Sequence, residues 1–186
     1  MRTLAKDLHS FLGKSVTVAG WVNSRRDHGG LIFIDLRDHT DIIQLVITPD
    51  TKAPFALAES VRDEYVLEAT GTMRERAPEL VNPHIPTGTI ELVVKDLTLL
   101  NKSNPLPVNT HDDGEKSSED LRLKYRYLDL RRPSMQSILK RRSEFYHFIR
   151  NFMHERDFTE ITTPILANSS PEGARDFLVP SRLHPG

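Results

Sequence analysis

The sequence contains no cysteine and only one tryptophan among its 186 residues. The absence of cysteine excludes disulfide bonds and thiolate metal ligands, and it fits the reducing conditions of the cytoplasm. No apolar run approaches the roughly 20 residues that a membrane-spanning helix requires. Residues 1–10 also lack the long apolar core of a signal peptide. We therefore expect a globular, cytoplasmic protein.

A strong excess of either charge is also missing, because the formal net charge is only -1. This total hides an uneven distribution along the chain. Residues 122–142 hold eight Lys and Arg against a single acid, Asp129, whereas residues 1–107 hold 12 basic and 14 acidic side chains. Nucleic-acid binding by bulk charge requires a positive surface. Any nucleic acid bound by residues 1–107 must therefore be held by specific contacts.

Alternating apolar residues predict a small barrel in the first 107 residues. A short helix, Leu4–Leu12, is expected to begin after a Thr3 cap and to end at Gly13. The predicted strands and the one helix among them cover residues 15–23, 31–37, 41–48, 54–64 (helix), 65–74 and 89–101. The order β-β-β-α-β-β is typical of the OB-fold, a five-stranded barrel that often binds oligonucleotides. An unrelated small β-barrel is the alternative.

The remaining sequence predicts a linker and part of a second domain. Residues 102–120 are polar and without periodicity, which indicates a surface linker. An amphipathic helix is expected over residues 134–155, with Pro133 in its first turn. Residues 157–166 are expected to form a short strand, and the segment that follows is loop-like. One helix and one strand bury too little surface to form a core, so further sequence or a partner chain is expected to complete this domain.

Two neighbouring strands of the predicted barrel carry the residues of a candidate nucleobase site. Alternation in LIFIDLR directs Ile34 and its apolar neighbours to the core and leaves Phe33 on the opposite face. Gln44 faces outward from the next strand by the same reasoning. An aromatic ring stacks on an unpaired base, and an amide reads its Watson–Crick edge. The pattern therefore indicates a site for single-stranded RNA.

The loop before these strands adds positive charge to the candidate site. Arg25 and Arg26 lie where OB-folds meet their ligands, and both could bind phosphate groups. Gly29 and Gly30 permit a tight turn beside them. The alternative interpretation is that Phe33 packs under the N-terminal helix and that both arginines are merely solvated.

Two other segments have possible functional roles. The basic stretch 121–133 either lines an RNA backbone or forms a structural hinge whose arginines pair with carboxylates of the barrel. The segment 171–177, PEGARDF, places Glu172 on a loop, where a carboxylate could close over a cationic amine. No metal-ligand spacing, phosphate-binding glycine loop or nucleophile triad is present, so we expect no metal site and no catalytic residue within this chain.

Three sequence segments together resemble the aspartyl-tRNA synthetases of bacterial type, which are class II enzymes. They are GWVNSRRDHGGLIFIDLRD (20–38), RLKYRYLDLRRP (122–133) and SPEGARDFLVPSR (170–182). The resemblance covers the whole chain in order. It implies an OB-fold anticodon-binding domain over residues 1–107, a hinge over 108–133, and the beginning of the α+β catalytic domain over 134–186.

The resemblance also implies roles for particular residues. Phe33 matches the aromatic that stacks on the central anticodon base, and Gln44 matches the amide that reads it. Arg26 matches an anticodon-contacting arginine of the loop, and Glu91 matches the carboxylate that recognises the first anticodon base. Glu172 matches the glutamate of the loop that closes over the substrate aspartate.

The family's reaction joins aspartate to tRNA-Asp through an aspartyl-adenylate, using ATP and Mg²⁺. Residues 156–166 resemble motif 1, which builds the homodimer interface in this class. The ATP-binding motifs 2 and 3 are expected beyond Gly186, so the 186-residue chain is expected to bind tRNA without aminoacylating it. His28 resembles relatives that also charge tRNA-Asn, with neutral variation in a loop as the alternative. A standalone single-stranded nucleic-acid-binding module is the alternative function.

Overall fold

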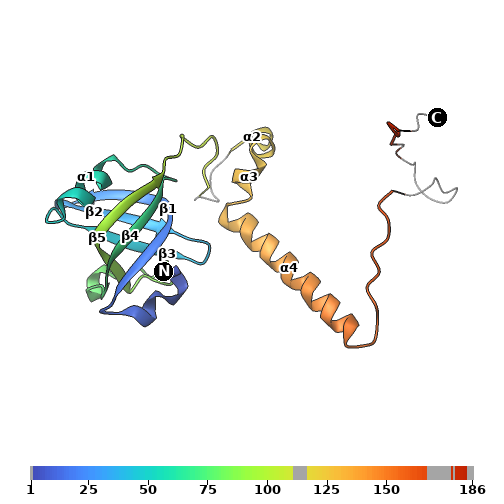
Figure 1. Ribbon diagram of the computed structural model, residues 1–186, viewed down its shortest axis with the longest axis horizontal. Coiled ribbons are helices and arrows are strands. Elements are labelled where there is room, and N and C mark those ends of the chain that lie inside the picture. Colours follow the sequence, from blue (N-terminus) through green and yellow to red (C-terminus); the bar gives the residue numbers. More distant parts are fainter. Residues whose placement is uncertain (1, 111–116, 167–176, 178, 184–186) are drawn as a thin grey trace. The chain divides into compact units, whose positions relative to one another are not determined.

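The computed structural model describes residues 2–110, 117–166, 177 and 179–183. Its N-terminal part is a barrel that closes in the strand order β1-β2-β3-β5-β4 (Figure 1). The elements of this part are the 3-10 helix η1 (Ala5–Phe11), strands β1 (Ser15–His28), β2 (Leu31–Arg37) and β3 (Ile42–Ile47), helix α1 (Lys52–Ser60), strand β4 (Val66–Glu75), the 3-10 turn η2 (Pro78–Leu80) and strand β5 (Ile90–Asn101). Neighbouring strands are antiparallel, except that β3 and β5 are parallel. This arrangement confirms the predicted OB-fold.

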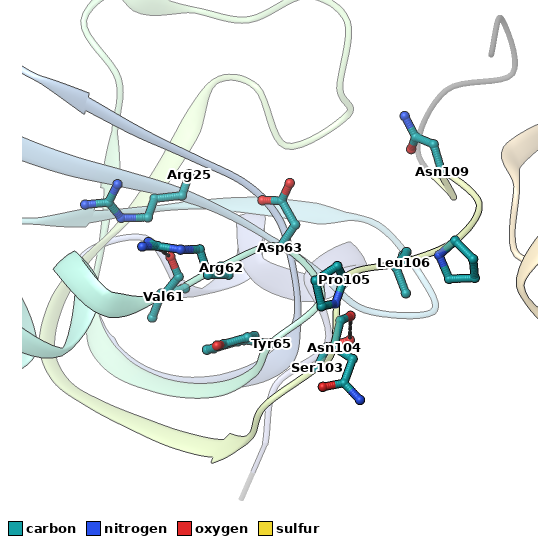
Figure 2. A pocket seen from close by; sticks show the side chains of 11 residues that line it. Arg25, Val61, Arg62, Asp63, Tyr65, Ser103, Asn104, Pro105, Leu106 and Asn109 are labelled. Atoms are coloured by element: carbon teal, nitrogen blue, oxygen red, sulfur yellow. Dashed lines mark hydrogen bonds between the residues drawn. The ribbon is translucent and has the colours of Figure 1, made fainter.

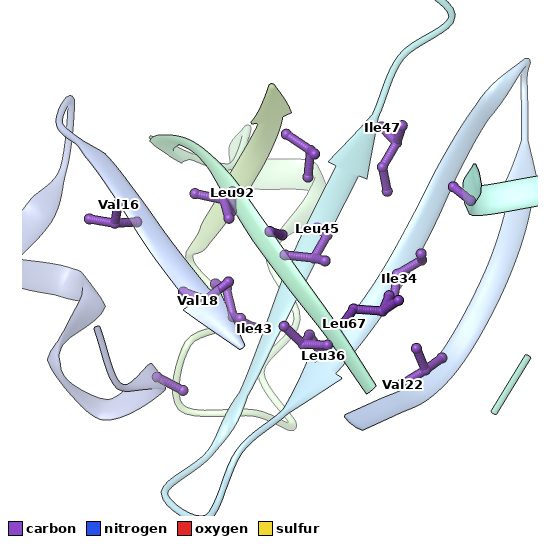
Figure 3. Packing of buried hydrophobic residues seen from close by; sticks show 14 of the residues in the cluster. Val16, Val18, Val22, Ile34, Leu36, Ile43, Leu45, Ile47, Leu67 and Leu92 are labelled. Atoms are coloured by element: carbon purple, nitrogen blue, oxygen red, sulfur yellow. The ribbon is translucent and has the colours of Figure 1, made fainter. Parts of the chain in front are cut away.

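Alternation along the strands builds the barrel core. In β2 the buried residues are Ile32, Ile34 and Leu36, and the positions between them are partly exposed. Leu45 of β3 and Leu92 of β5 are also fully buried, and Figure 3 shows their side chains meeting those of β2 inside the barrel. Each such side chain contributes about 1.5–3 kcal/mol when it leaves water completely. The predicted inward and outward faces of β2 are thus confirmed.

The N-terminal helix differs from the prediction in its type and in its cap. It is a 3-10 helix, shorter than the predicted Leu4–Leu12 by one residue at each end. The backbone N–H of Ala5 donates to Asp38 Oδ2 at 2.9 Å, so the cap comes from a distant loop. The backbone N–H of Thr3 donates instead to the Thr17 carbonyl at 2.8 Å. Thr3 was a wrong choice of cap because it joins the edge of the barrel.

Strand β1 is longer than the predicted strand, which ended at Asn23. The pairing of β1 with β2 shifts between Val22 and Ser24, as at a β-bulge, and then continues to the end of β1. Gly29 and Gly30 connect the strands with φ values of 60° and 77°, the positive φ pair of a tight hairpin turn. The predicted turn is therefore confirmed. The other strands begin and end within one residue of their predicted bounds, and helix α1 ends four residues early.

The basic stretch after the linker is helical. It forms α2 (Glu119–Lys124) and α3 (Arg126–Asp129), and the Ser118 hydroxyl accepts a hydrogen bond from the Leu121 N–H at the start of α2. Within it the Asp129 carboxylate is completely buried and pairs with the guanidinium groups of Arg122, Arg126 and Arg132.

A fourth arginine of this stretch, Arg131, approaches Glu64 of the barrel, with Nη2 3.4 Å from Oε2. Of the two interpretations of this segment, these ion pairs favour the structural hinge. Because five basic side chains lie in residues 122–132 against Asp129 and Glu64, the basic stretch 121–133 still retains an excess of positive charge.

The chain divides into two compact units, Met1–Met135 and Gln136–Gly186. Most of the second unit's described residues lie in α4 (Pro133–His154), whose bounds differ by one residue from the predicted helix. Its apolar stripe is exposed, with Phe148 at 63% and Phe152 at 41%. None of the helices in the described ranges has the length and apolar character to cross a membrane.

The strand expected over residues 157–166 is not observed. These residues lie within the described part of the chain and have no regular secondary structure. Ile161 is 78% exposed and Ile165 is completely exposed. A β-strand needs a neighbouring strand to accept and donate its backbone hydrogen bonds, and no described strand pairs with this segment. The local sequence pattern alone was therefore insufficient to predict a strand over residues 157–166.

Candidate nucleic-acid interface

The outer face of the barrel carries a cavity of about 520 Å³ between strands and the β1–β2 hairpin. Five residues predicted from the sequence to contact or select tRNA line this one cavity: Arg26, His28, Phe33, Gln44 and Glu91. The remaining lining residues are Asp27, Leu31, Val46, Arg74 and Leu80. The structure therefore brings together residues that are as far apart in sequence as the first and fifth strands.

Strand pairing explains why these residues meet. Arg26 of β1 lies opposite Phe33 of β2, and Phe33 lies opposite Val46 of β3. All three side chains point to the same face because directly opposed residues share a face of the sheet. The parallel pairing of β3 with β5 then brings Gln44 beside Glu91.

Phe33 lies on the outer face, as the alternation predicted. It is partly exposed and does not belong to the buried core cluster. The N-terminal helix instead packs Ala5 and Leu8 into that core. The alternative interpretation, in which Phe33 packs under this helix, is therefore wrong, and the ring lines the cavity.

A chain of hydrogen bonds fixes the carboxamide of Gln44. Its Oε1 accepts from Arg26 Nη2 at 3.4 Å, and its Nε2 donates to Glu91 Oε2 at 3.2 Å. Gln44 faces outward from the barrel, as predicted, but it is only 9% exposed and therefore forms the floor of the cavity. Because both partners are charged, the orientation of the amide is set before any ligand arrives.

Glu91 is buried between two arginines that the sequence interpretation did not single out. Its Oε1 accepts from Arg74 Nε at 3.0 Å, and its Oε2 lies 3.8 Å from Arg76 Nε. Burial lowers the pKa of Arg76, and the charge of Glu91 opposes this effect. The signal for Arg74 was the alternation in β4, which turns Met73 inward and its neighbour outward.

Arg26 and Arg25 point to different sides of the barrel. Arg26 Nη2 pairs with Asp35 at 3.0 Å and its side chain is 54% exposed, which leaves it accessible in the cavity. Arg25 Nε donates to the Ala58 carbonyl at 2.7 Å, and Nη1 pairs with Asp27 at 2.8 Å. The two side chains diverge because both residues lie within β1, where successive side chains alternate. Of the two arginines that the sequence assigned to the candidate site, only Arg26 lines it.

Arg25 lines a second, larger cavity of about 690 Å³. Figure 2 shows this cavity between the loop that carries Arg62 and Tyr65 and the segment that carries Asn104 and Leu106. The first cavity, in contrast, holds an amide that is hydrogen-bonded between a guanidinium and a buried carboxylate beside an aromatic ring. We therefore take the first cavity as the candidate base-binding site.

The other predicted residues are placed as follows. His28 is exposed at the end of β1, opposite Leu31, at the rim of the first cavity. Glu172 lies outside the described residues, so its predicted contact with aspartate stays a prediction. Among the residues that the structure describes, no group of three His, Cys, Asp or Glu side chains could hold a metal ion.

Two family models match this chain. The model for the OB-fold nucleic acid binding domain matches residues 16–100, and the model for the class II tRNA synthetases of the D, K and N group matches residues 118–186. The first match covers the barrel and its cavity. Together they define a class II synthetase with an anticodon-binding OB-fold.

Sequence relatives narrow the class further. The chain is 54% identical over 175 residues to an aspartate–tRNA ligase of Exiguobacterium sibiricum. The alignment covers 94% of this chain and 29% of that ligase. It is 55% identical over 178 residues to an aspartate–tRNA(Asp/Asn) ligase of Caldanaerobacter subterraneus. This alignment covers 94% of this chain and 30% of that ligase. The chain is thus homologous to aspartate–tRNA ligases over 94% of its length, and it spans about 30% of the length of these relatives.

A solved structure of an asparaginyl-tRNA synthetase from Pyrococcus horikoshii is similar, with a TM-score of 0.80 and 25% identity. The matched region covers 93% of this chain and 38% of the asparaginyl-tRNA synthetase chain. The structure of the aspartyl-tRNA synthetase of Entamoeba histolytica has a TM-score of 0.79 at 23% identity. The matched region covers 92% of this chain and 41% of that structure's chain. This second likeness concerns the fold alone.

Proposed function

We propose that this chain is the anticodon-binding part of an aspartate–tRNA ligase and that the 520 Å³ cavity holds bases of the tRNA-Asp anticodon. The observation that carries the proposal is the convergence of Phe33, Gln44 and Glu91 on one cavity. A ring, an amide with a fixed orientation and a buried carboxylate provide stacking, edge recognition and an acceptor for base N–H groups.

Each residue of the cavity makes a different contact with the anticodon. Phe33 stacks on the central base, which contributes about 1–3 kcal/mol. Gln44 reads the edge of the same base because Arg26 and Glu91 hold its oxygen and nitrogen in known directions. Glu91 accepts hydrogen bonds from the first anticodon base, and Arg26 provides positive charge toward the RNA backbone.

The whole ligase is proposed to attach L-aspartate to tRNA through aspartyl-adenylate, as a cytoplasmic homodimer. ATP and Mg²⁺ would supply the activated phosphoryl chemistry when bound. The described residues include no acidic cluster that fits Mg²⁺, so no step is assigned to them, and Glu172 is proposed to contact the aspartate.

Acceptance of tRNA-Asn is a second candidate function. His28 lies at the rim of the cavity that holds the proposed anticodon-reading residues. Several relatives carry the name aspartate–tRNA(Asp/Asn) ligase, including that of Moorella thermoacetica at 54% identity. Charging assays with the full-length protein on tRNA-Asp and tRNA-Asn test this candidate, and no charging of tRNA-Asn would refute it.

Binding of a tRNA-Asp transcript to the 186-residue chain tests the main proposal. Replacing the central anticodon base should weaken binding by about 1–3 kcal/mol, because stacking and edge reading both concern that base. Equal affinity for the two transcripts would instead indicate a module that binds single-stranded nucleic acid without reading its sequence.

A further inference from the structure

Glu64 has a backbone conformation that residues other than glycine rarely adopt, with φ of 63°. It lies just before β4, and its side chain is only 3% exposed. Its backbone N–H donates to the Val22 carbonyl at 2.8 Å, and the Val22 N–H donates to the Tyr65 carbonyl at 2.9 Å. The barrel therefore holds this carboxylate in a fixed place, and the residue has no role in the anticodon cavity.

The carboxylate of Glu64 joins three separate segments of the first unit. Oε1 accepts from Arg37 Nη2 of β2 at 2.6 Å and from the Thr110 hydroxyl at 3.3 Å. Oε2 lies 3.4 Å from Nη2 of Arg131, in the hinge after α3. A single buried anion thus connects the barrel wall, the segment after β5 and the hinge.

The surroundings of Glu64 support a docked hinge. The guanidinium of Arg131 lies over the Trp21 ring, 5.0 Å from its centroid, which is a favourable cation–π distance. Thr110 is 2% exposed. Asp63 and Tyr65, on either side of Glu64 in the sequence, line the same cavity as Asn104 and Leu106 of the segment after β5 (Figure 2).

We propose that Glu64 is a positioning residue that docks the basic hinge against the barrel. Docking holds the anticodon cavity and the exposed Lys124 of the hinge in one arrangement, so that a whole tRNA can contact both. This inference rests on the proposed tRNA-binding function. When a variant populates the docked state only about one tenth of the time, the apparent affinity for a ligand that needs both surfaces falls about tenfold.

The single tryptophan provides a direct readout of docking. In the 186-residue chain, Glu64→Gln should shift the emission of Trp21 to longer wavelength, because Arg131 leaves its ring and water replaces it. Glu68→Gln is the matched control, since Glu68 is exposed on β4 and only four residues away. The control should leave the emission unchanged. Arg131→Ala removes the guanidinium from the Trp21 ring and gives the reference emission with which the shift of Glu64→Gln is compared.

RNA binding separates positioning from general damage to the fold. Glu64→Gln should lower the affinity for a tRNA-Asp transcript about tenfold, while its affinity for the isolated anticodon stem-loop stays within about twofold of the parent chain. If Glu64→Gln does not fold, Arg131→Ala should show the same split between transcript and stem-loop.

Failure of the positioning role of Glu64 and failure of the proposed tRNA-binding function give different results. An unchanged Trp21 emission together with unchanged transcript affinity, in folded Glu64→Gln and Arg131→Ala proteins, would overturn the positioning role. If the parent chain does not bind the stem-loop, the proposed function fails, and the emission of Trp21 still decides whether Glu64 docks the hinge.

Discussion

Replacing Phe33 by alanine separates a ligand-binding role from a structural role. The ring is partly exposed and lies outside the buried core cluster. A fully buried Phe→Ala change costs about 3–5 kcal/mol, so a partly exposed ring should cost roughly half of that or less. Loss of stacking should weaken binding of the anticodon stem-loop by about 1–3 kcal/mol, which corresponds to about 5-fold to 150-fold in Kd.

Two measurements on the same protein decide the outcome. Fluorescence anisotropy with a labelled stem-loop gives Kd, and urea unfolding gives the free energy of unfolding. Phe55→Ala is the matched control, because Phe55 of α1 is partly buried against the core and does not line the cavity. It should lower the free energy of unfolding by a similar amount and leave Kd unchanged.

Two results would contradict this reasoning. A Phe33→Ala protein that binds the stem-loop as tightly as the parent would show that the ring does not stack on a base. A loss of about 3–5 kcal/mol in the free energy of unfolding would show that the ring belongs to the core.

Three further changes test the site and the hinge. Glu91→Gln should leave Arg76 without its buried counter-charge, lower the free energy of unfolding by about 1–3 kcal/mol and weaken stem-loop binding; an unchanged Kd would remove Glu91 from the recognition site. Asp129→Asn should cost about 1–3 kcal/mol in urea unfolding, since its partly exposed arginine partners can be solvated again. Hydrogen bonding from Arg122, above all, lowers the pKa of Asp129 from its usual value of 3.8. Its stabilising contribution is therefore complete above that pH and is lost as pH falls through the lower folded value; unfolding followed from about pH 6 to about pH 2 should show a larger loss of stability in the parent than in Asp129→Asn. Gly30→Ala, at φ of 77°, should cost about 1–2 kcal/mol, and no loss on thermal unfolding would exclude strain at the turn.

Local alternation determined the barrel and much of the candidate site. Period-two apolar patterns fix which side chains of a strand face the core, so the outward position of Phe33 followed from its neighbours alone. The glycine pair at 29–30 likewise predicted the hairpin, because positive φ at both positions is a local property of the backbone.

Features that depend on distant segments required the tertiary structure. The cap from Asp38 to Ala5 joins residues 33 positions apart, and no local pattern indicates it. The burial of Gln44 results from the parallel pairing of β3 with β5, which brings Glu91 beside it. The strand expected at residues 157–166 failed for the same reason, since a strand exists only where another strand pairs with it.

The sequence by itself therefore determined most of the strands, the turn at residues 29–30 and the outward position of Phe33, because these depend on neighbours within a few positions. Only the tertiary structure decided which charges meet. Glu64 binds Arg37 and Arg131 across 27 and 67 positions of the chain, and ion pairs of this kind depend on barrel closure and hinge docking. Local sequence patterns contain no information on such distant contacts.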